Sequence, residues 1–581
     1  MKSSLLKKIN NQYLLIFLIM FCSAVIRFHD LGSIPLNDNE ANLALSALNL
    51  AKGDFSNLAS HPLYLAFTSL FIQFFSANNI TARLLPALIG SVFTLLPFLY
   101  RKWVGSAFVI LMSILLIFDP VLISLSRQAD SRMLAMFFFV LMTAFLLHEK
   151  IVYSGIAAGL FILTGSFAWY LIVLMVITLV IYAKITKFQK NRWGVIAPIK
   201  NNVKKMHIFI ISALICVLLI GTGFMRQPQL INSIIQGLID FSEGWFKGGL
   251  FFNKSLLLLV GFITSYLLFI IFLFIGFINK NSRYPHIEKI FLINGAVSFF
   301  FLLGYPATSL IDILIFLPFF YFFVCRGILK WWLIIQKNFK VSMLIGIPII
   351  GLAGFIWLAV LRILNLPLGS IESAQMLVAI IGSAFLIGLI LLLIGWGWSL
   401  KIALSGFSLG FFTILFLFQA SGIFHSFSPS RRPASEIWWT STYVEDSNIL
   451  VKTVEEVSLW NTGIRNGLAI QIYGVDSPSL QWQLRDHKVF SDNVIHPENL
   501  SPVVITKTKD NPLLEDSYRG QKVPYYSEPN WIQNIPQFLD SVDFYRWLFY
   551  RDSMIRQDEI FIWIKADLFV GNNIKFESGV F

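Results

Sequence analysis

The chain is poor in charged residues and in cysteine. Of its 581 residues, 13% are charged and 56% are hydrophobic, and the mean hydropathy is +0.71. Soluble globular proteins carry about 25% charged residues, so this composition excludes a protein that is dissolved only in water. The three cysteines, Cys22, Cys216 and Cys325, lie in or beside apolar runs, which excludes a disulfide framework. A Gly-rich phosphate loop, a Cys/His pattern with metal-ligand spacing and an internal repeat are also missing.

Acidic residues are scarce where the chain is most apolar. Up to residue 424 there are 30 Lys and Arg against 12 Asp and Glu, whereas beyond it there are 15 against 20. The net charge of +13 therefore belongs to the apolar part. There the basic residues gather in short loops, as the topology signals of membrane proteins do, so we expect no nucleic-acid partner.

Apolar runs of about 20 residues predict a mainly α-helical, polytopic membrane protein with about thirteen transmembrane helices. The predicted spans are 12–28, 81–100, 105–124, 132–148, 151–165, 167–183, 207–225, 252–277, 288–304, 308–327, 342–363, 374–398 and 402–424. The rest of the chain, 425–581, contains the strand-like runs "LAIQIYG", "PVVITK" and "EIFIWIK" and the helix-like run "FLDSVDFYRWLFYRD". We therefore expect a membrane domain over 1–424 and a soluble α/β domain over 425–581.

One further apolar segment, "HPLYLAFTSLFIQFFSA" (61–77), decides the topology. If it does not cross the membrane, 21 of the 30 Lys and Arg of the membrane part fall on one side, as the positive-inside rule requires. We therefore predict an interfacial helix here, a first outer loop over 29–80 and a second outer loop over 126–131. The N-terminus is then cytoplasmic, and the C-terminal domain lies outside the cytoplasmic membrane.

Two carboxylates stand at the start of an amphipathic helix in "IPLNDNEANLALSAL". Asn37 as N-cap and Glu40 at the third helical position fit a capping box, and Asp38 in the first turn suits the helix dipole. Asp130, in "SLSRQADSRMLAMFF", can likewise cap the span that begins near Ser131. Taken singly, each of these acids is explained by helix capping.

Together the carboxylates indicate chemistry. The predicted topology places them on the outer face at the membrane surface, with Arg83, Arg127 and Arg132 at a similar depth. Carboxylates can activate a hydroxyl group, and arginines can hold a phosphate. This set could transfer a group from a phosphate donor to an acceptor.

The order of these features resembles the C-type superfamily of glycosyltransferases (GT-C), which includes protein O-mannosyltransferases, the aminoarabinose transferase of lipid A and the oligosaccharyltransferase catalytic subunit. The resemblance covers about residues 12–190 and is carried by the acidic motif, by "SHPLYLAFTSLFIQFFSANNITARLLPALIGSVFTLLPFLYRKWVG" and by "SRQADSRMLAMFF". It implies a polyprenyl-phosphate-linked sugar donor and an inverting transfer on the outer face to a protein, lipid or glycan. It also implies an essential acid in each of the first two outer loops.

Carried over by position, the first acid is Asp38 or Glu40 and the second is Asp130. The Asp-Glu pair usual in the family reads Asn39-Glu40 here. Because the capping box lets Glu40 hold the turn, we expect Asp38 to be the working acid. His61 takes the place of a lysine near the donor phosphate, and "TARLLP" supplies Arg83 as in relatives.

Two points stay open at this stage. Some relatives need a divalent ion, and Asp38, Glu40 and Asp130 could hold Mg²⁺ or Mn²⁺. The phrase "YGVDSPSLQWQLRDHKVF" resembles a segment that follows the membrane region in some prokaryotic members. It either helps to bind the acceptor or caps the membrane domain, and we favour the second.

Two other functions fit the composition. A transporter or lipid flippase would carry ionisable residues and broken helices near the bilayer midplane, often with repeat symmetry. Here the charges lie near predicted span ends, Asp240, Glu243 and Asp312 included. A catalytically idle GT-C relative that acts as a scaffold would explain the altered acidic motif.

Overall fold

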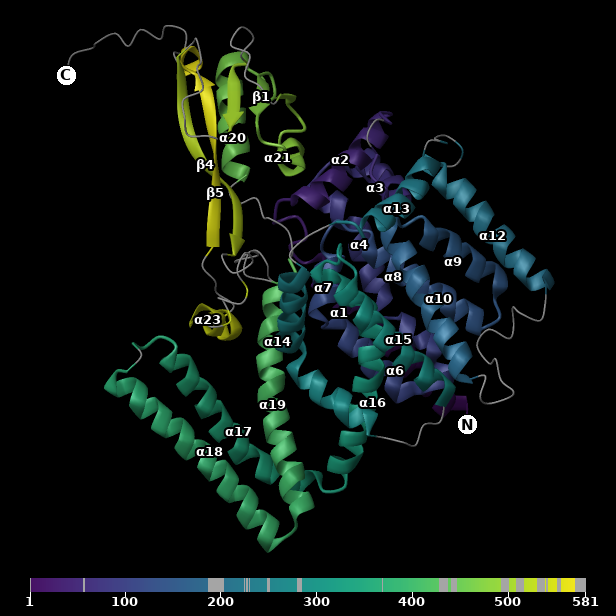
Figure 1. Ribbon diagram of the computed structural model, residues 1–581, viewed down its shortest axis with the longest axis vertical. Coiled ribbons are helices and arrows are strands. Elements are labelled where there is room, and N and C mark those ends of the chain that lie inside the picture. The colour runs from purple at the N-terminus through teal and green to yellow at the C-terminus, as the bar shows by residue number, and fades with distance from the viewer. Residues whose placement is uncertain are drawn as a thin grey trace.

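The computed structural model of the chain (Figure 1) describes residues 2–55, 58–186, 203–223, 225, 228, 230–247, 251–278, 285–367, 369–427, 437–439, 447–492, 501–507, 517–529, 535, 539, 542–550 and 555–569. Most of it is helical, and a small sheet domain formed by the last part of the chain stands at one end of the helices. The predicted fold class, a polytopic α-helical protein with a C-terminal α/β domain, is confirmed.

The helical part contains twenty elements within the described residues. In chain order they are α1 (Lys2–Phe28), α2 (Asp38–Lys52), α3 (Pro62–Phe75), α4 (Asn79–Phe93), η1 (Leu96–Tyr100), α5 (Arg101–Val104), α6 (Ser106–Ile117), α7 (Pro120–Ser126), α8 (Arg132–Leu147), α9 (Ile151–Ile162), α10 (Ser166–Thr186), α12 (Val203–Gly221), α13 (Leu230–Glu243), α14 (Phe251–Phe277), α15 (Pro285–Gly304), η2 (Leu310–Ile315), α16 (Leu317–Gln336), α17 (Phe339–Ile363), α18 (Ile371–Gly397) and α19 (Leu400–Phe427).

Every one of the thirteen predicted spans overlaps a helix. Among the described residues, nine helices are long and apolar enough to cross a membrane, and α6 with α7, bent by 59°, would make a tenth. The other three predicted spans coincide with shorter apolar helices, in α1, α8 and α9. The count of thirteen stays a prediction.

One predicted span, 308–327, was misplaced. Residues 310–315 form the short 3₁₀ helix η2, and the long helix α16 runs from Leu317 to Gln336. Pro318 lies in the first turn of α16, where its missing N–H does no harm, so the helix begins there. It then continues through Lys330, which the sequence pattern had placed in a loop.

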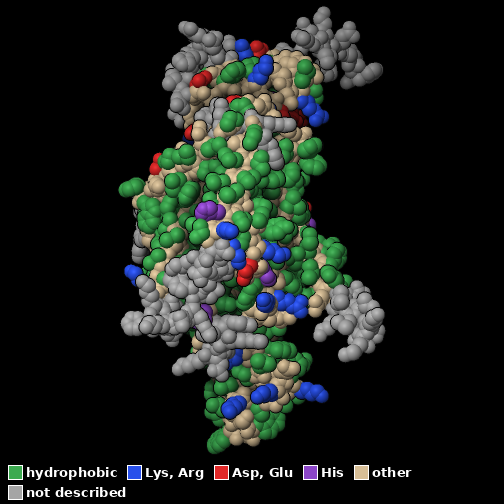
Figure 2. All heavy atoms as spheres, turned by 90° about the vertical axis from the view of Figure 1, so that its right-hand side faces the viewer, with side chains coloured by type: hydrophobic (Ala, Val, Ile, Leu, Met, Phe, Trp, Pro, Cys, Tyr) green, Lys and Arg blue, Asp and Glu red, His purple; other side chains and the backbone are tan. Residues whose placement is uncertain are grey.

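The exterior of the helical part is apolar. Figure 2 shows hydrophobic side chains over most of one face, with Lys and Arg gathered below its middle and again at the lower tip. The helix α18 packs little against the rest of the chain, and large apolar side chains such as Leu377, Ile381 and Phe385 are exposed on it. Lipid solvates such a surface, as expected for a multi-pass membrane protein.

The first predicted outer loop contains two helices. The capping box of α2 is present: the Glu40 N–H donates to Asn37 Oδ1 (2.9 Å), and the Asn37 N–H donates to Glu40 Oε2 (3.2 Å). Helix α3, the segment predicted to lie at the interface, has 14 residues, so its length of about 21 Å is less than the bilayer core. The two helices share one apolar core with α4.

The second predicted outer loop follows a break in a helix. Asp119 caps α7 by accepting from the Leu122 N–H (2.6 Å), and the hydroxyls of Tyr266 (2.7 Å) and Tyr321 (2.5 Å) donate to its other oxygen. Pro120 in the first turn of α7 suits a helix start. The chain therefore turns between α6 and α7, and α7 carries it to residues 126–131.

The C-terminal part is an α/β domain. It comprises α20 (Ser447–Thr462), β1 (Ala469–Tyr473), α21 (Pro478–Gln483), β2 (Lys488–Asp492), β3 (Val503–Thr506), β4 (Tyr518–Pro529), α23 (Val542–Tyr550), β5 (Ile555–Lys565) and η7 (Ala566–Phe569). The five strands form one mixed sheet in the order β2-β1-β3-β5-β4, in which β1 is parallel to β2 and β3, and β5 is antiparallel to β3 and β4. The predicted strands β1, β3 and β5 and the predicted helix α23 are confirmed.

Candidate functional site

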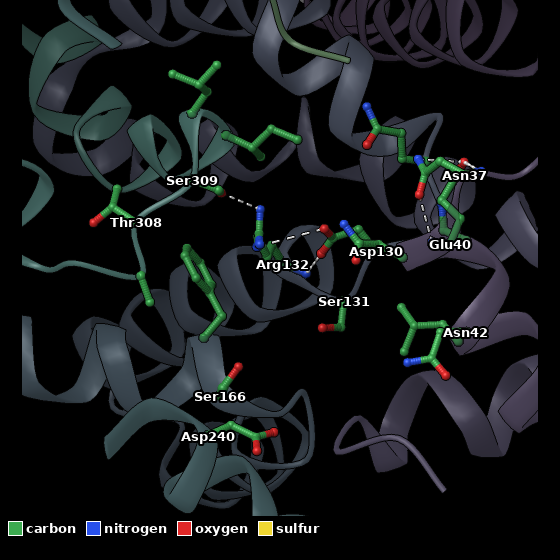
Figure 3. Close-up of a pocket in the computed structure, with 18 of the residues that line it drawn as sticks. Asn37, Glu40, Asn42, Asp130, Ser131, Arg132, Ser166, Asp240, Thr308 and Ser309 are labelled. Carbon is green, nitrogen blue, oxygen red and sulfur yellow. Dashed lines mark hydrogen bonds and ion pairs between the residues drawn. The ribbon is translucent and has the colours of Figure 1, made fainter. Parts of the chain in front are cut away.

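A cavity of about 770 Å³ opens where the two predicted outer loops meet (Figure 3). Its lining comes from the start of α2, the segment 58–61, residues 128–132, the first residues of α10, the helix α13, the first turns of α14, the connection from α15 to η2, Ile437, Trp439 and the end of β4. The predicted topology had placed all of these segments on one side of the membrane. Their convergence on a single cavity agrees with that arrangement.

Glu40 and Arg83 form a buried ion pair at one wall of the cavity. Arg83 Nε and Nη2 donate to the two carboxylate oxygens of Glu40 (2.8 and 2.7 Å), and 1% of the arginine and 2% of the glutamate are exposed. Arg83 also donates to three backbone carbonyls, those of Leu31, Ile34 and Pro35, which occupies its remaining N–H groups. Glu40 lines the cavity, but Arg83 does not.

Glu40 also joins the two loops. Its Oε1 accepts a hydrogen bond from the backbone N–H of Ala129 (2.7 Å), in the second loop, while Oε2 accepts from the backbone and side chain of Asn37. A buried carboxylate that accepts this many hydrogen bonds fixes the relative position of its partners. This contact places Asp130, the neighbour of Ala129, beside the start of α2.

Asp38 lies outside the cavity lining. Its Oδ1 accepts hydrogen bonds from Ser477 Oγ (2.6 Å) and from the Ser479 N–H (3.0 Å), both in the C-terminal domain. The two acids of the first loop, expected to be alternatives for one role, therefore have different surroundings. Glu40 faces the cavity wall, and Asp38 faces the helix α21.

Asp130 and Arg132 lie side by side in the lining of the cavity (Figure 3). Arg132 Nε is 3.8 Å from Asp130 Oδ2 and 3.5 Å from Asp312 Oδ1, and Arg132 Nη1 donates to Ser309 Oγ (2.8 Å). The N-cap of α8 is Ser131 rather than Asp130. Asp130 Oδ1 accepts from the Arg132 N–H (2.7 Å), the first N–H of α8, which leaves Asp130 Oδ2 toward the guanidinium.

His61 lines the cavity beside Ser131. Its Nδ1 is 2.9 Å from the Thr164 carbonyl oxygen and 2.8 Å from Ser131 Oγ. Because a carbonyl can only accept, Nδ1 carries the proton. Burial lowers the pKa of His61 below its ordinary value of 6.5, against the opposing effects of the Thr164 carbonyl and of Asp130. At neutral pH the ring is therefore uncharged.

Arg127 lies apart from the cavity. Its side chain is 2% exposed, and Nη1 donates to the Ile26 carbonyl (2.9 Å) at the end of α1. Of the four side chains expected to hold a phosphate, the structure thus brings Arg132 and His61 to the cavity. It engages Arg83 with Glu40 and Arg127 with the backbone of α1.

Two charged side chains of the cavity were not expected from the sequence. Asp240, on α13, accepts from Ser60 Oγ (2.5 Å) and from Gln236 Nε2 (3.0 Å), and Lys254 lies in the first turns of α14. In the described part of the chain, Lys254 has no ion pair. The sequence did contain a signal for Lys254, because a lysine at the predicted outer end of a span departs from the positive-inside rule.

The three carboxylates considered for a divalent ion do not gather. Asp38 is turned to α21, whereas Glu40 and Asp130 line the cavity, each with its own cationic partner. Over the described residues, no group of three or more His, Cys, Asp or Glu is arranged to hold a metal ion. The three carboxylates therefore do not form one ion site, and no step below involves a metal ion.

The fold is similar to that of known structures. Two crystal structures of ArnT from Cupriavidus metallidurans match: one bound to undecaprenyl phosphate, at 15% identity and a TM-score of 0.53, and one in the apo state, at 13% and 0.51. Each alignment covers 95% of this chain and 98% of the other. No family model matches the chain, and no curated protein matches its sequence.

ArnT is a GT-C glycosyltransferase. The predicted resemblance to the GT-C superfamily is therefore confirmed at the level of the fold, and it extends beyond residues 12–190 to nearly the whole chain.

Proposed function

We propose that this chain is an inverting glycosyltransferase that moves a sugar from a polyprenyl-phosphate donor to an acceptor on the outer face of the cytoplasmic membrane. One observation carries the proposal: in the cavity, the carboxylate of Asp130 lies beside the guanidinium of Arg132. The solved ArnT structure that holds undecaprenyl phosphate supports a donor of this class.

The phosphate is assigned to Arg132 and Lys254, the two Lys or Arg side chains that line the cavity among the described residues. Arg132 shares its charge with Asp130 and Asp312, whereas Lys254 adds a charge that has no ion-paired partner among the residues that the structure describes. The helices α8, α10 and α14 begin at the cavity, and their N-terminal dipoles also favour an anion. Neutral His61 contributes a polar contact rather than a charge.

The acceptor hydroxyl is assigned to Asp130. Its carboxylate takes the hydroxyl proton while the acceptor oxygen bonds to the anomeric carbon, on the side opposite the phosphate. The bond from the anomeric carbon to the phosphate oxygen breaks, and polyprenyl phosphate leaves with both bonding electrons. Arg132 and Lys254 stabilise the charge that develops on it. Glu40 and Arg83 act indirectly, since they hold the two loops together.

Purified full-length protein in nanodiscs tests this function with a panel of undecaprenyl-phosphate-linked hexoses and pentoses. We expect Asp130→Asn to lower the transfer rate by about 10²- to 10⁴-fold, the usual contribution of a general base. Asp476→Asn, a loss of charge at an exposed site of the C-terminal domain, is the control. Full transfer by the Asp130 variant would contradict the assignment. Mass spectrometry of lipid-linked sugars and surface glycans after gene deletion would identify sugar and acceptor.

The placement of Asp38 favours a second candidate, a relative that binds lipid-phosphate sugars without turnover. Asp38 is engaged with α21, and Glu40 is neutralised by Arg83. Under this alternative the wild-type protein binds undecaprenyl phosphate, and the binding depends on Arg132 and Lys254. No sugar would leave any donor of the panel with any acceptor.

A further inference from the structure

The C-terminal domain contacts the first outer loop through the helix α21. Ser477 Oγ and the Ser479 N–H donate to Asp38, and Ser479 Oγ donates to the Leu36 carbonyl (2.5 Å). These three hydrogen bonds join the start of α2 to the start of α21. Asp38 is the charged member of the set, and a carboxylate that accepts two short hydrogen bonds is a strong anchor.

The same helix places an aromatic side chain in the core of the loop. Trp482 is fully buried among apolar side chains of α2, α3 and α4, and its Nε1 donates to Asn79 Oδ1 (2.9 Å). Arg485 stacks on the indole ring, with its guanidinium carbon 4.6 Å from the ring centroid, and donates to the Ala77 carbonyl. The contact is thus a packed interface, which we call the α21 interface: Leu36, Asp38, Ala77 and Asn79 against Ser477, Ser479, Trp482 and Arg485.

The α21 interface is connected to the cavity through β4. Tyr525 of β4 is buried near Ser477 and Asp38, and two residues further along the strand Ser527 lines the cavity, followed by Pro529. The end of β4 is therefore held over the cavity by the same contacts that hold α21 on α2. A domain that moved away from α2 would also move Ser527 and Pro529 away from the cavity.

We propose that Asp38 is a positioning residue that holds the C-terminal domain on the first outer loop, and that the domain so held forms the wall past which the acceptor enters the cavity. The inference rests on the proposed function. The polyprenyl chain of the donor stays in the lipid, so the acceptor approaches from the side on which the C-terminal domain stands (Figure 1). Asp38 then acts on the acceptor through the domain and does not touch the reacting atoms.

A reporter cysteine can test the wall without any measurement of transfer. Ser527→Cys is introduced into full-length protein that lacks the native cysteines (Cys22→Ala, Cys216→Ala, Cys325→Ala), and its reaction with a membrane-impermeant maleimide is timed. Ser527 is 2% exposed, so we expect slow labelling in the parent protein. We expect Asp38→Ala and Ser477→Ala to accelerate it about fivefold, the effect of losing one or two buried hydrogen bonds.

Three further variants make the test specific. Asp38→Asn keeps an acceptor oxygen, so its labelling rate should stay within about twofold of the parent. The double variant Asp38→Ala with Ser477→Ala should label no faster than Asp38→Ala alone, because Asp38→Ala already removes the hydrogen bond between the two side chains. Asp476→Asn, which removes an exposed charge next to Ser477, should change nothing. Unchanged labelling in Asp38→Ala and Ser477→Ala would overturn the proposal.

Transfer assays separate Asp38 as a positioning residue from Asp38 as the working acid. A positioning role predicts that Asp38→Asn retains transfer within about threefold, and that Asp38→Ala raises the acceptor KM more than it lowers kcat. A fall of about 10²-fold in kcat for Asp38→Asn, with unchanged labelling at residue 527, would instead make Asp38 catalytic and overturn the inference. If the labelling pattern holds but no donor of the panel is used, the proposed function fails and the interface stands.

Discussion

The two predicted outer loops present their acids in opposite ways. In the first loop, Glu40 is ion-paired with Arg83 and accepts a hydrogen bond from the backbone of the second loop. Asp38 is hydrogen-bonded to α21 and the residue before it. In the second loop, one oxygen of Asp130 accepts from the first N–H of α8, and the other lies beside Arg132 in the cavity. The longer loop, which carries the motif of Asp38 and Glu40, is therefore held by contacts on both sides. Under the proposed mechanism, the acidic motif of the first loop assembles the site, and the reactive acid comes from the second loop.

The largest expected effect separates the two loops directly. Asp130→Asn should lower the rate of transfer at least 100-fold, whereas Asp38→Asn should stay within about threefold of the wild type, because only the first removes a base from the cavity. The measurement is single-turnover transfer from the lipid-linked sugar that the wild type uses. Equal losses in both variants would abolish the difference between the loops.

Loss of the Glu40 charge should destabilise the protein most. Glu40→Gln leaves buried Arg83 without its counter-ion, and breaking a buried pair in this way costs about 3–5 kcal/mol. Thermal unfolding in detergent should report it as a large fall in Tm. The control is Glu149→Gln, which removes an exposed ion pair with Lys205 and should cost less than about 1 kcal/mol. Similar Tm values for the two variants would show that Glu40 does not join the loops.

The contact of His61 with the turn between α9 and α10 can be tested by substitution of Gly165. A Cβ on Gly165 would clash with His61 Nδ1 and with the Ser60 carbonyl oxygen, and Gly165 has a φ of +104°. Gly165→Ala should therefore cost about 1–3 kcal/mol and should weaken the binding of undecaprenyl phosphate. Gly369→Ala is the matched control, since Gly369 has a φ of +89° but open space around it. If the two substitutions lower the stability and the binding equally, backbone strain alone explains the effect, and contact with His61 contributes nothing.

A smaller effect is expected for Lys254, the cavity cation that comes from α14 and from neither loop. Lys254→Gln should weaken the binding of undecaprenyl phosphate by about tenfold, or about 1.4 kcal/mol, and the loss should shrink at high salt. Lys247→Gln changes the same charge seven residues earlier, outside the cavity lining, and should bind like the wild type. Titration by native mass spectrometry measures both. An equal loss in the two variants would indicate a general effect of charge.

The smallest effect concerns pH. Because the pKa of His61 is lowered in the folded protein, the unfolded chain binds a proton more readily. The contribution of neutral His61 to the free energy of unfolding is therefore fully present above pH 6.5. This contribution is lost as the pH falls through the lower pKa of the folded state. Wild-type Tm should therefore fall more than that of His61→Gln between pH 7 and pH 5. Parallel curves would show that His61 does not titrate differently on folding.

Much of the helical fold could be predicted from the sequence because each span carries its own signal. The capping box of Asn37 and Glu40 was also predictable, since both partners lie within four residues. The amphipathic helix α13 was missed because it is too polar to span and stands in a loop. The strand β4 was missed because Gly520, Pro524 and Pro529 disfavour a strand, although an edge strand tolerates them.

The roles of the site residues depended on contacts that no local pattern contains. The partner of Asp38 lies 439 residues away, and that of Glu40 lies 43 residues away. Helix capping and catalysis favour the same residue types at the same positions. The sequence alone therefore could not show which of the carboxylates lies in the cavity with an oxygen toward a cation. Only the packing of α2 between α21 and the second loop distinguishes Asp38 from Asp130.

The burial of Trp482 has a consequence for how the protein is made. Its partner Asn79 is synthesised 403 residues earlier, and at about 5–20 residues per second the groove between α2, α3 and α4 waits about 20–80 s for its last side chain. During that interval an apolar surface of the nascent chain is uncovered. A chaperone that shields this groove would therefore protect the inserted membrane part from aggregation, and a premature stop that removes α21 would leave the groove exposed.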